Sequence, residues 1–192
     1  MKRITVLGAN GRVGRLVVSL LLEKSYDVTA FVYHDDGSFD ANHVRVAQGD
    51  VHDVSSVEAA LTDGDAVICT LGSWGTPQKD IVSSGVRAII PYMQKNKIKR
   101  IISLTGAESR ASGDDLSLIH RAMYIGISVG AGKILRDGED HITQLEQSRL
   151  DWTVIRSPVM TETGATKYRL SSKRCLPWQT IHRHAVAKAM VD

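Results

Sequence analysis

The sequence predicts an α/β fold of the Rossmann type, in which helices cover both faces of a doubly wound parallel sheet and form three layers. Short β-branched runs alternate with segments of helical periodicity for at least five rounds, which is typical of a parallel sheet. The first strand-to-helix connection, residues 8–14, holds three glycines in the spacing G-x-x-G-x-x-G. The 192 residues contain no linker, repeat or low-complexity tract, so we expect one domain over residues 1–192.

Periodicity assigns the elements in order. Strands are indicated by short apolar, β-branched runs that stop at glycine, aspartate or proline, and they are expected at residues 4–7, 27–33, 43–47, 65–70, 99–105 and 150–156. Helices are indicated by apolar residues three and four apart, and they are expected at residues 15–22, 54–61, 81–96, 139–147 and 181–190. Residues 106–138 mix glycine and serine with helical spacing and stay unassigned; we expect the substrate-side elements within 106–138 and 157–192.

The glycine-rich connection after the first strand is expected to bind the pyrophosphate of a dinucleotide. Glycine permits a tight turn and a close approach of the ligand, and the N–H groups at the start of the next helix favour an anion. The alternative is an ordinary glycine-bearing turn in an unrelated α/β protein. The strand before the turn, the helix after it and the second strand favour the nucleotide site.

Composition excludes several other classes of protein. No run of ~18 apolar residues is present, so we expect no transmembrane span and no membrane partner. The basic start, Met1–Arg3, is not followed by the apolar core of a signal peptide, which predicts a cytoplasmic protein. The net charge is only +3 and no long basic run occurs, so we expect no nucleic-acid partner. His182 and His184 have no third ligand nearby, so no metal site is expected.

Five segments together resemble the atypical short-chain dehydrogenase/reductases, in particular the NmrA-like, NAD(P)-binding group that includes biliverdin-IXβ (flavin) reductase. They follow the family's order along nearly the whole chain: residues 6–14, 49–53, 99–103, 148–156 with Pro158, and 181–187. In the last segment, His184 stands where the family usually has an acidic residue. The resemblance implies a Rossmann-like domain that binds NAD(P).

The resemblance also implies which positions contact the cofactor. In chain order from the pyrophosphate to the far wall of the nicotinamide, they are Gly8, Asn10, Gly11, Arg12, Val13, Tyr33, His34, Asp50, Val51, Thr70, Leu71, Gly72, Thr105, Gly106, Pro158 and Val159. Two of these have a structural alternative: Asp50 could form a turn, and Thr105 could satisfy the backbone at a strand end. Thr105 is also the one candidate for a catalytic role.

The end of the second strand bears on the choice between NAD and NADP. NAD sites usually place a carboxylate there, whereas NADP sites provide room and a positive charge. The strand ends at Tyr33 and His34, and the carboxylates of Asp35 and Asp36 come later. Arg12, with His34, could meet a 2′-phosphate, so NADP(H) is favoured over NAD(H). Asp35 folding back onto the ribose would reverse this preference.

The sequence lacks the tyrosine–lysine pair that donates a proton in orthodox short-chain dehydrogenases, and this limits the reactions that we expect. Orthodox short-chain dehydrogenases use a tyrosine and a lysine four residues later, but Tyr124 is followed at that spacing by Ser128. Lys133 lies in the same segment, where a solvated helical lysine is the simpler interpretation. Flavins and quinones tolerate protons from solvent, because the cofactor supplies the hydride.

The sequence therefore predicts an NAD(P)H-dependent oxidoreductase that reduces a flavin, quinone or similar planar small molecule. A non-catalytic NmrA-like module that binds NAD(P) and reports redox state is the alternative. A sugar-nucleotide epimerase is disfavoured by the short chain and the missing tyrosine–lysine pair. The oligomeric state stays open.

Overall fold

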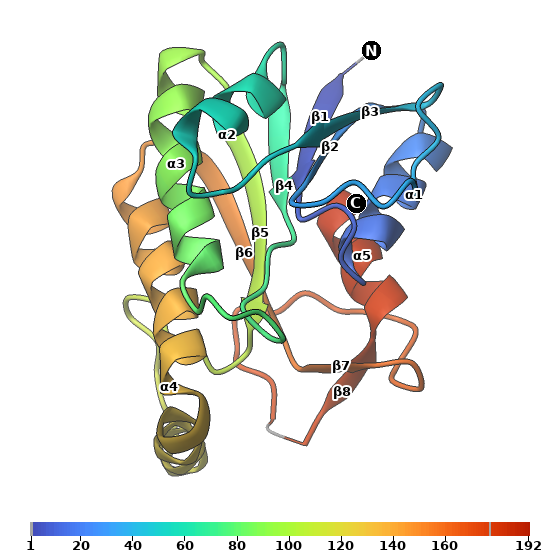
Figure 1. Ribbon diagram of the computed structural model, residues 1–192. Helices are drawn as coiled ribbons and strands as arrows, with labels where there is room; N and C mark the ends of the chain where they lie inside the picture. The colour runs from blue at the N-terminus through green and yellow to red at the C-terminus, as the bar shows by residue number, and fades with distance from the viewer. Residues whose placement is uncertain (1, 177) are drawn as a thin grey trace.

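A six-stranded, entirely parallel sheet forms the centre of the structure (Figure 1). The computed structural model describes residues 2–176 and 178–192. The sheet has the order β3-β2-β1-β4-β5-β6, which confirms the predicted Rossmann-like topology. The chain changes direction across the sheet between β1 and β4, where this fold binds its ligands. The strands are β1 (Arg3–Leu7), β2 (Asp27–Val32), β3 (Val44–Gln48), β4 (Ala66–Cys69), β5 (Arg100–Gly106) and β6 (Asp151–Ser157).

Helices cover both faces of the sheet, so the predicted three layers are present. On one face lie α1 (Gly14–Glu23) and α5 (Arg183–Val191); on the other lie α2 (Val54–Leu61), α3 (Ile81–Lys95) and α4 (Leu118–Gln147) (Figure 1). Each face has its own apolar core, one around Val17 and Met190 and the other around Phe31, Ile89 and Leu145. In the part of the chain that the structure describes, no helix is long and apolar enough to cross a membrane.

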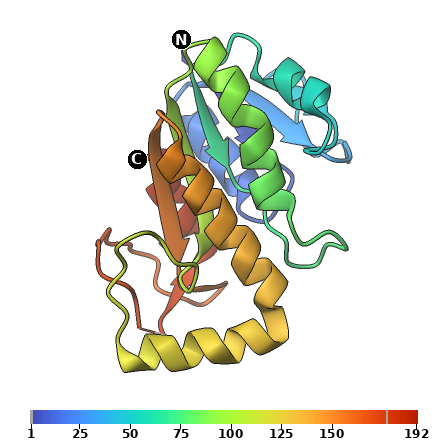
Figure 2. The same ribbon diagram turned by 90° about the vertical axis from the view of Figure 1, so that its left-hand side faces the viewer.

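The helix α4 resolves the segment that the sequence left unassigned. It begins at Leu118, and its backbone departs from helical geometry at Ala131, with φ −135° and ψ 29°. The part before Ala131 projects from the body of the domain, while the part after it packs beside α3 (Figure 2). Glycines at positions 126, 130 and 132 weaken helix propensity around this point. Local periodicity could not assign the helix because its first part has little core to face.

A small parallel pair of strands, β7 (Val159–Thr161) and β8 (Thr180–His182), precedes the last helix. The predicted helix over 181–190 therefore begins later than expected, at Arg183. The ring Nδ1 of His182 accepts a hydrogen bond from the His184 N–H at 3.2 Å and caps the helix. Pairing with a strand about twenty residues away overrides the local helical pattern at residues 181 and 182.

A buried carboxylate joins α4 to the start of α3. Asp137 accepts hydrogen bonds from the backbone N–H groups of Ser83 at 2.7 Å and Val82 at 3.2 Å, and the Ser73 hydroxyl also donates to it. Asp80, at the N-cap position of α3, makes no side-chain cap. The orphan N–H groups of α3 are thus satisfied from another helix, which fixes α4 against the loop after β4.

One turn after Asp137, His141 is fully buried on α4. Neither ring nitrogen has a hydrogen-bond partner among the described residues. Burial disfavours the charged imidazolium and lowers the pKa of His141 to about 4, although the negative charge of Asp137 acts in the opposite direction. The imidazole is therefore neutral near neutral pH.

Acidification is expected to destabilise the protein through His141. In the unfolded chain the imidazole binds a proton near its ordinary pKa, whereas in the folded protein it does not, so stability falls as pH drops below that value. Between about pH 7 and about pH 5 this group should remove about 2 kcal/mol from the free energy of unfolding. Urea unfolding across this range should show a shallower pH dependence for His141→Leu than for the wild type. If the free energy of unfolding changes equally with pH in both proteins, His141 is not the group that destabilises the protein in acid.

Candidate functional site

The glycine-rich turn after β1 has the geometry that a bound nucleotide needs. Gly8 has a φ of +73°, and the N–H groups of Gly8 and Ala9 both donate to the carbonyl oxygen of Phe31, at 3.1 and 3.2 Å. A Cβ on Gly14 would lie 2.6 Å from the carbonyl oxygen of Ala9, so only glycine fits there. These contacts bring the first turn of α1 directly against the end of β1.

The start of α1 offers an anion site that the protein itself does not fill. Val13 occupies the N-cap position, where it provides no side-chain hydrogen bond, and the first turn carries no acidic residue. The Arg15 N–H of this turn donates to the Gly11 carbonyl oxygen at 3.0 Å, whereas the N–H groups of Gly14 and Leu16 have no backbone partner among the described residues. These two groups and the positive end of the helix dipole are thus available to a phosphate. Arg12 and Gly11 are exposed beside it. The residues present therefore fit the pyrophosphate of a dinucleotide.

The loop after β4 adjoins this turn. The Thr70 hydroxyl donates to the carbonyl oxygens of Leu7 at 2.8 Å and Gly8 at 3.1 Å. Leu71 packs over Gly8, with a methyl carbon 3.2 Å from the position that a Cβ would take. Gly72 is exposed, and no atom lies within 4 Å of the position of its missing Cβ. Three of the residues expected below the adenosine half of the cofactor thus lie beside the glycine turn.

At the end of β3, the side chain of Asp50 forms a turn. Its Oδ1 accepts hydrogen bonds from the backbone N–H of His52 at 2.9 Å and from the His52 ring at 2.8 Å. These bonds lower the pKa of the Asp50 carboxyl and raise that of the His52 imidazole. Val51 is buried and faces Gly85 of α3. The structure therefore shows the turn-forming role that the sequence left open for Asp50, and its contact with adenine stays a prediction.

The end of β2 is tied to the glycine turn by one amide. The Asn10 side chain donates to the carbonyl oxygen of His34 at 2.9 Å. Tyr33 is 75% exposed, and the His34 side chain is exposed as well. This contact places the segment after β2 beside residues 10–12, as the expected ribose site requires.

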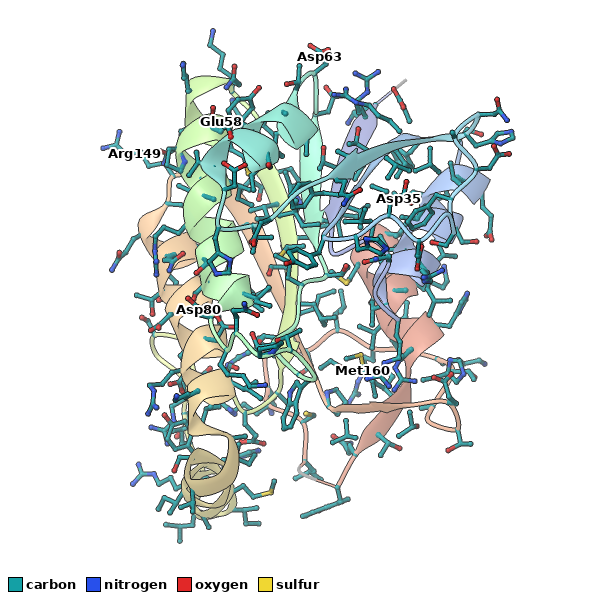
Figure 3. All side chains as sticks on the ribbon, viewed as in Figure 1. Asp35, Glu58, Asp63, Asp80, Arg149 and Met160 are labelled. Carbon is teal, nitrogen blue, oxygen red and sulfur yellow. The ribbon has the colours of Figure 1, made fainter. Side chains whose placement is uncertain are left out.

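The two carboxylates after β2 already have partners. Asp35 accepts a hydrogen bond from the Gly37 N–H at 3.0 Å, and Asp36 forms an ion pair with Arg15. Figure 3 shows Asp35 on the α1 side of the sheet, close to the end of β2. Within residues 2–176 and 178–192, the Arg12 guanidinium makes no ion pair with any of these acids. The arrangement leaves a cation, and no unengaged carboxylate, near the expected ribose.

The end of β5 is held by two hydroxyls below α4. The hydroxyls of Thr105 and Ser109 are 3.0 Å apart. Gly138 of α4 lies over them, and a Cβ there would be 2.6 Å from the Thr105 Oγ1. Thr105 thus bonds to a side chain instead of to the backbone, and glycine in α4 makes room for the pair.

The end of β6 completes this side of the site. Gly106 pairs in register with Ser157, and the Ala107 N–H donates to the Ser157 carbonyl at 2.8 Å. Pro158 follows at once, and Val159 is exposed at the start of β7. The residues expected beside the nicotinamide are therefore neighbours at the ends of β5 and β6.

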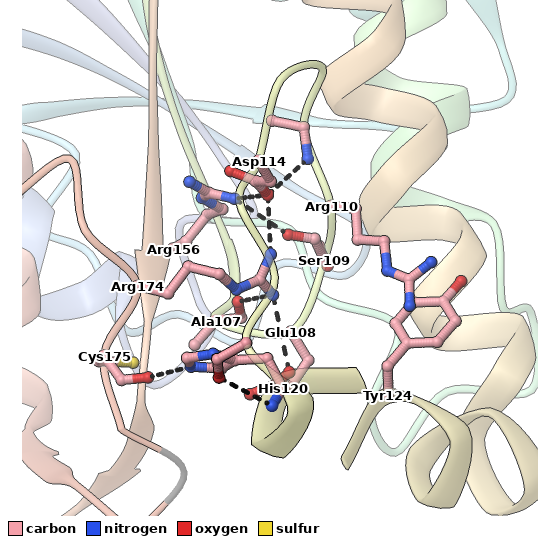
Figure 4. Close-up of polar contacts among 12 residues, drawn as sticks. Ala107, Glu108, Ser109, Arg110, Asp114, His120, Tyr124, Arg156, Arg174 and Cys175 are labelled. Atoms are coloured by element: carbon pink, nitrogen blue, oxygen red, sulfur yellow. Dashed lines mark hydrogen bonds and ion pairs between the residues drawn. The ribbon is translucent and has the colours of Figure 1, made fainter. Parts of the chain in front are cut away.

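A polar cluster that sequence reasoning missed lies beyond these strand ends (Figure 4). Asp114, in the β5–α4 loop (residues 107–117), forms ion pairs with Arg156 of β6 and, at 2.7 Å, with Arg174. Arg174 also donates to the Ala107 carbonyl at 2.7 Å and lies 3.6 Å from Glu108. Arg156 and Arg174 lie 42 and 60 residues after Asp114 in the chain, so no local sequence pattern indicates these ion pairs.

The start of α4, directly after this loop, is joined to the segment between β7 and β8 by a histidine. His120 Nε2 donates to the Cys175 carbonyl oxygen at 3.1 Å, and its Nδ1 lies 2.8 Å from the Ser117 hydroxyl (Figure 4). Arg174 and Cys175 are adjacent, so one of two neighbouring residues binds the loop and the other binds the first turn of α4. The two segments predicted to be substrate-side, 106–138 and 157–192, therefore contact each other here.

Tyr124 is not part of an orthodox proton-donating pair. Its hydroxyl donates to Glu139 at 3.0 Å, and the Arg110 guanidinium lies 3.2 Å from its ring centre. Burial and the bond to Glu139 raise the pKa of Tyr124. Ser128 bonds to its own helix, and Lys133 lines a separate pocket of about 360 Å³ at the start of α3. Neither side chain assists the tyrosine.

The parallel sheet in this strand order, with an uncapped glycine turn at the end of β1, defines a dinucleotide-binding Rossmann-like domain. The chain belongs to the NAD(P)H-binding family, whose model matches residues 8–192. The family assignment agrees with the fit of the turn to a pyrophosphate.

Solved structures share the whole fold. A Rossmann-fold NAD(P)-binding family protein from Shigella flexneri has a TM-score of 0.77 and 21% identity, and the match covers 100% of this chain and 85% of that one. ChuY, an anaerobillin reductase from Escherichia coli O157:H7, has a TM-score of 0.76 and 25% identity, and the match covers 98% of this chain and 88% of ChuY. A short-chain dehydrogenase/reductase from Veillonella parvula in complex with NADP has a TM-score of 0.76 and 19% identity, and the match covers 100% of this chain and 86% of that one.

The glycine turn can be tested directly. We expect Gly14→Ala to weaken NADPH binding at least ~10-fold, because its methyl group must push α1 away from the carbonyls that it now contacts. Gly130→Ala is the matched control, since no atom lies within 4 Å of the position of its Cβ. Calorimetric titration measures both. Wild-type affinity in a folded Gly14→Ala variant would argue against this site.

Proposed function

We propose that the protein is an NAD(P)H-dependent oxidoreductase that passes hydride to a flavin, a quinone or a similar planar small molecule. The observation that carries the proposal is a site that fits a dinucleotide but has no tyrosine–lysine pair at its nicotinamide end. Acceptors of this kind take their protons from water, so they do not need such a pair. A likeness to ChuY, which is named as a reductase, supports the same class of reaction.

Each part of the site has a task in this reaction. A bound NAD(P)H supplies the hydride. The turn at residues 8–14 would hold the pyrophosphate, and Thr70 and Leu71 support that turn from below. Thr105, held by Ser109, would orient the nicotinamide side. Orientation of this kind is the main contribution that a protein makes to hydride transfer.

We further propose a preference for NADP(H). Asp35 is oriented by the Gly37 N–H and Asp36 by Arg15, so both carboxylates after β2 already have a partner within the protein, which supports this preference. Arg12 is exposed beside the turn and can meet a 2′-phosphate. The structure from Veillonella parvula was solved with NADP, which agrees with this preference.

Removal of Arg12 is expected to weaken NADPH selectively. Arg12→Ala should raise the Kd for NADPH about 10-fold, the cost of one charge-assisted contact, and leave that for NADH unchanged. Arg149→Ala is a suitable control, because Arg149 is exposed far from this end of the sheet (Figure 3). Calorimetry at fixed ionic strength separates the two cofactors. An equal loss for NADH, or none for NADPH, would place the 2′-phosphate elsewhere.

Turnover is tested with a panel of acceptors. We expect the purified protein to oxidise NADPH, followed at its absorbance band, in the presence of menadione, riboflavin or FMN under anaerobic conditions. Gly14→Ala should lower kcat/KM for NADPH at least ~10-fold, in line with its weaker binding. Tight binding of NADP⁺ with no turnover on any member of the panel would reject the oxidoreductase and favour a non-catalytic NAD(P)-binding regulator.

A further inference from the structure

The guanidinium of Arg156, of which only Nη1 donates hydrogen bonds within the described residues, lies beside the end of β5. Arg156 pairs in register with Thr105, so both side chains leave the sheet on the same face. Its Nη1 donates to Asp114 and, at 3.4 Å, to the carbonyl oxygen of Ser109. Across the described part of the chain, Nε and Nη2 have no hydrogen-bond partner, and the side chain is 22% exposed. Figure 4 shows these nitrogens directed away from Asp114.

Within the described residues, no carboxylate accepts a hydrogen bond from the Nε or Nη2 of Arg156. One oxygen of Asp114 accepts from both Arg156 and Arg174, so a single carboxylate serves two guanidinium groups. Glu108 balances Arg174, which is itself only 6% exposed. Asp114 and Glu108 are both more buried than Arg156. Among these four charged residues, Arg156 therefore has the most exposed side chain.

Hydride transfer to a planar acceptor creates a charge that such a group can bind. A quinone or flavin that accepts a hydride gains one hydrogen nucleus and two electrons, and it carries one negative charge until water supplies a proton. An orthodox tyrosine would neutralise this charge directly. The Tyr124 hydroxyl instead donates a hydrogen bond to Glu139. A cation held in place before the reaction lowers the energy of the developing anion.

We propose that Arg156 is a catalytic residue of this reaction, whose free guanidinium edge binds the anion formed on the acceptor. Asp114 is then a positioning residue, because it holds one side of the guanidinium and leaves the other side for the acceptor. The assignment rests on the proposed function and adds the group that stabilises the reduced acceptor. It also explains why an arginine stands next to Thr105 at the end of an edge strand.

Binding without turnover tests the anion contact. Two naphthoquinones that differ at one position serve as probes: 2-hydroxy-1,4-naphthoquinone, an anion at neutral pH, and menadione, its neutral 2-methyl analogue. With protein saturated by NADP⁺, we expect Arg156→Gln to raise the Kd of the anion about 10-fold and to leave that of menadione unchanged.

Arg100→Gln is the matched control for this titration. Arg100 pairs with Asp151 at the opposite end of β5 and β6, so its loss removes the same charge far from the site. Neither probe should bind differently to this variant. Equal effects of Arg156→Gln on both probes, or no effect on either, would overturn the proposal.

Kinetics distinguish catalysis from a structural role. Arg156→Ala should lower kcat with menadione about 10- to 100-fold, and dilute guanidinium chloride should restore part of the rate, whereas sodium chloride should not. Asp114→Asn should lower kcat without rescue by guanidinium, because the arginine still occupies its place. An unchanged kcat in Arg156→Ala, or a loss that guanidinium does not restore, would contradict a catalytic Arg156.

The two proposals fail separately. If the wild-type protein reduces no acceptor, the proposed reaction is wrong, and the binding titration alone decides whether Arg156 recognises an anion. If the wild type is active and both Arg156 variants match it in kcat and in binding of the anionic probe, the reaction stands and the role of Arg156 is wrong.

Discussion

The contact between α1 and the end of β1 is the constraint on which the site depends. Gly14 lies against the carbonyl oxygens of Gly8 and Ala9, where any side chain would collide with backbone. Because no side chain caps the helix, the start of α1, close to the end of β1, is left open to an anion. Thr70 then bonds to carbonyls of the same turn and sets the distance to the loop after β4. The phosphate site is thus made by backbone, and side chains hold that backbone in place.

A second set of constraints shapes the other end of the site. Asp114 and Arg174 join the β5–α4 loop to the segment between β7 and β8, and Asp137 joins α4 to the start of α3. Each is a charged group that is mostly buried, so removal of one partner would leave the other poorly solvated. Such contacts add less to net stability than their geometry suggests, but they select one arrangement of segments that lack a large apolar core. The region beyond the ends of β5 and β6 is therefore held together by polar groups.

The sequence was sufficient to predict the parts of the molecule that bury apolar residues at a regular period. The six central strands and the helices after β1, β3 and β4 all do so, and their positions agree with the structure within a few residues. The first part of α4 and the strand β8 could not be predicted, because one has little core to face and the other depends on a distant partner. For the site, strand ends indicated the backbone positions near the glycine turn. The pairing of Asp114 with Arg156 and Arg174 could not be found, since it depends on how three distant segments fold together.

Partial exposure of Arg156 has a chemical meaning if the protein reduces quinones or flavins. A fully buried guanidinium would stabilise an anion more strongly, but it would also exclude the water that must finally protonate the product. A fully exposed one would be screened and free to choose other conformers. Arg156 lies between these limits, fixed at one amino group by Asp114 and open to solvent on the rest of its fork. In the proposed reaction, Arg156 would thus combine a positioned charge with access for the water that supplies the proton.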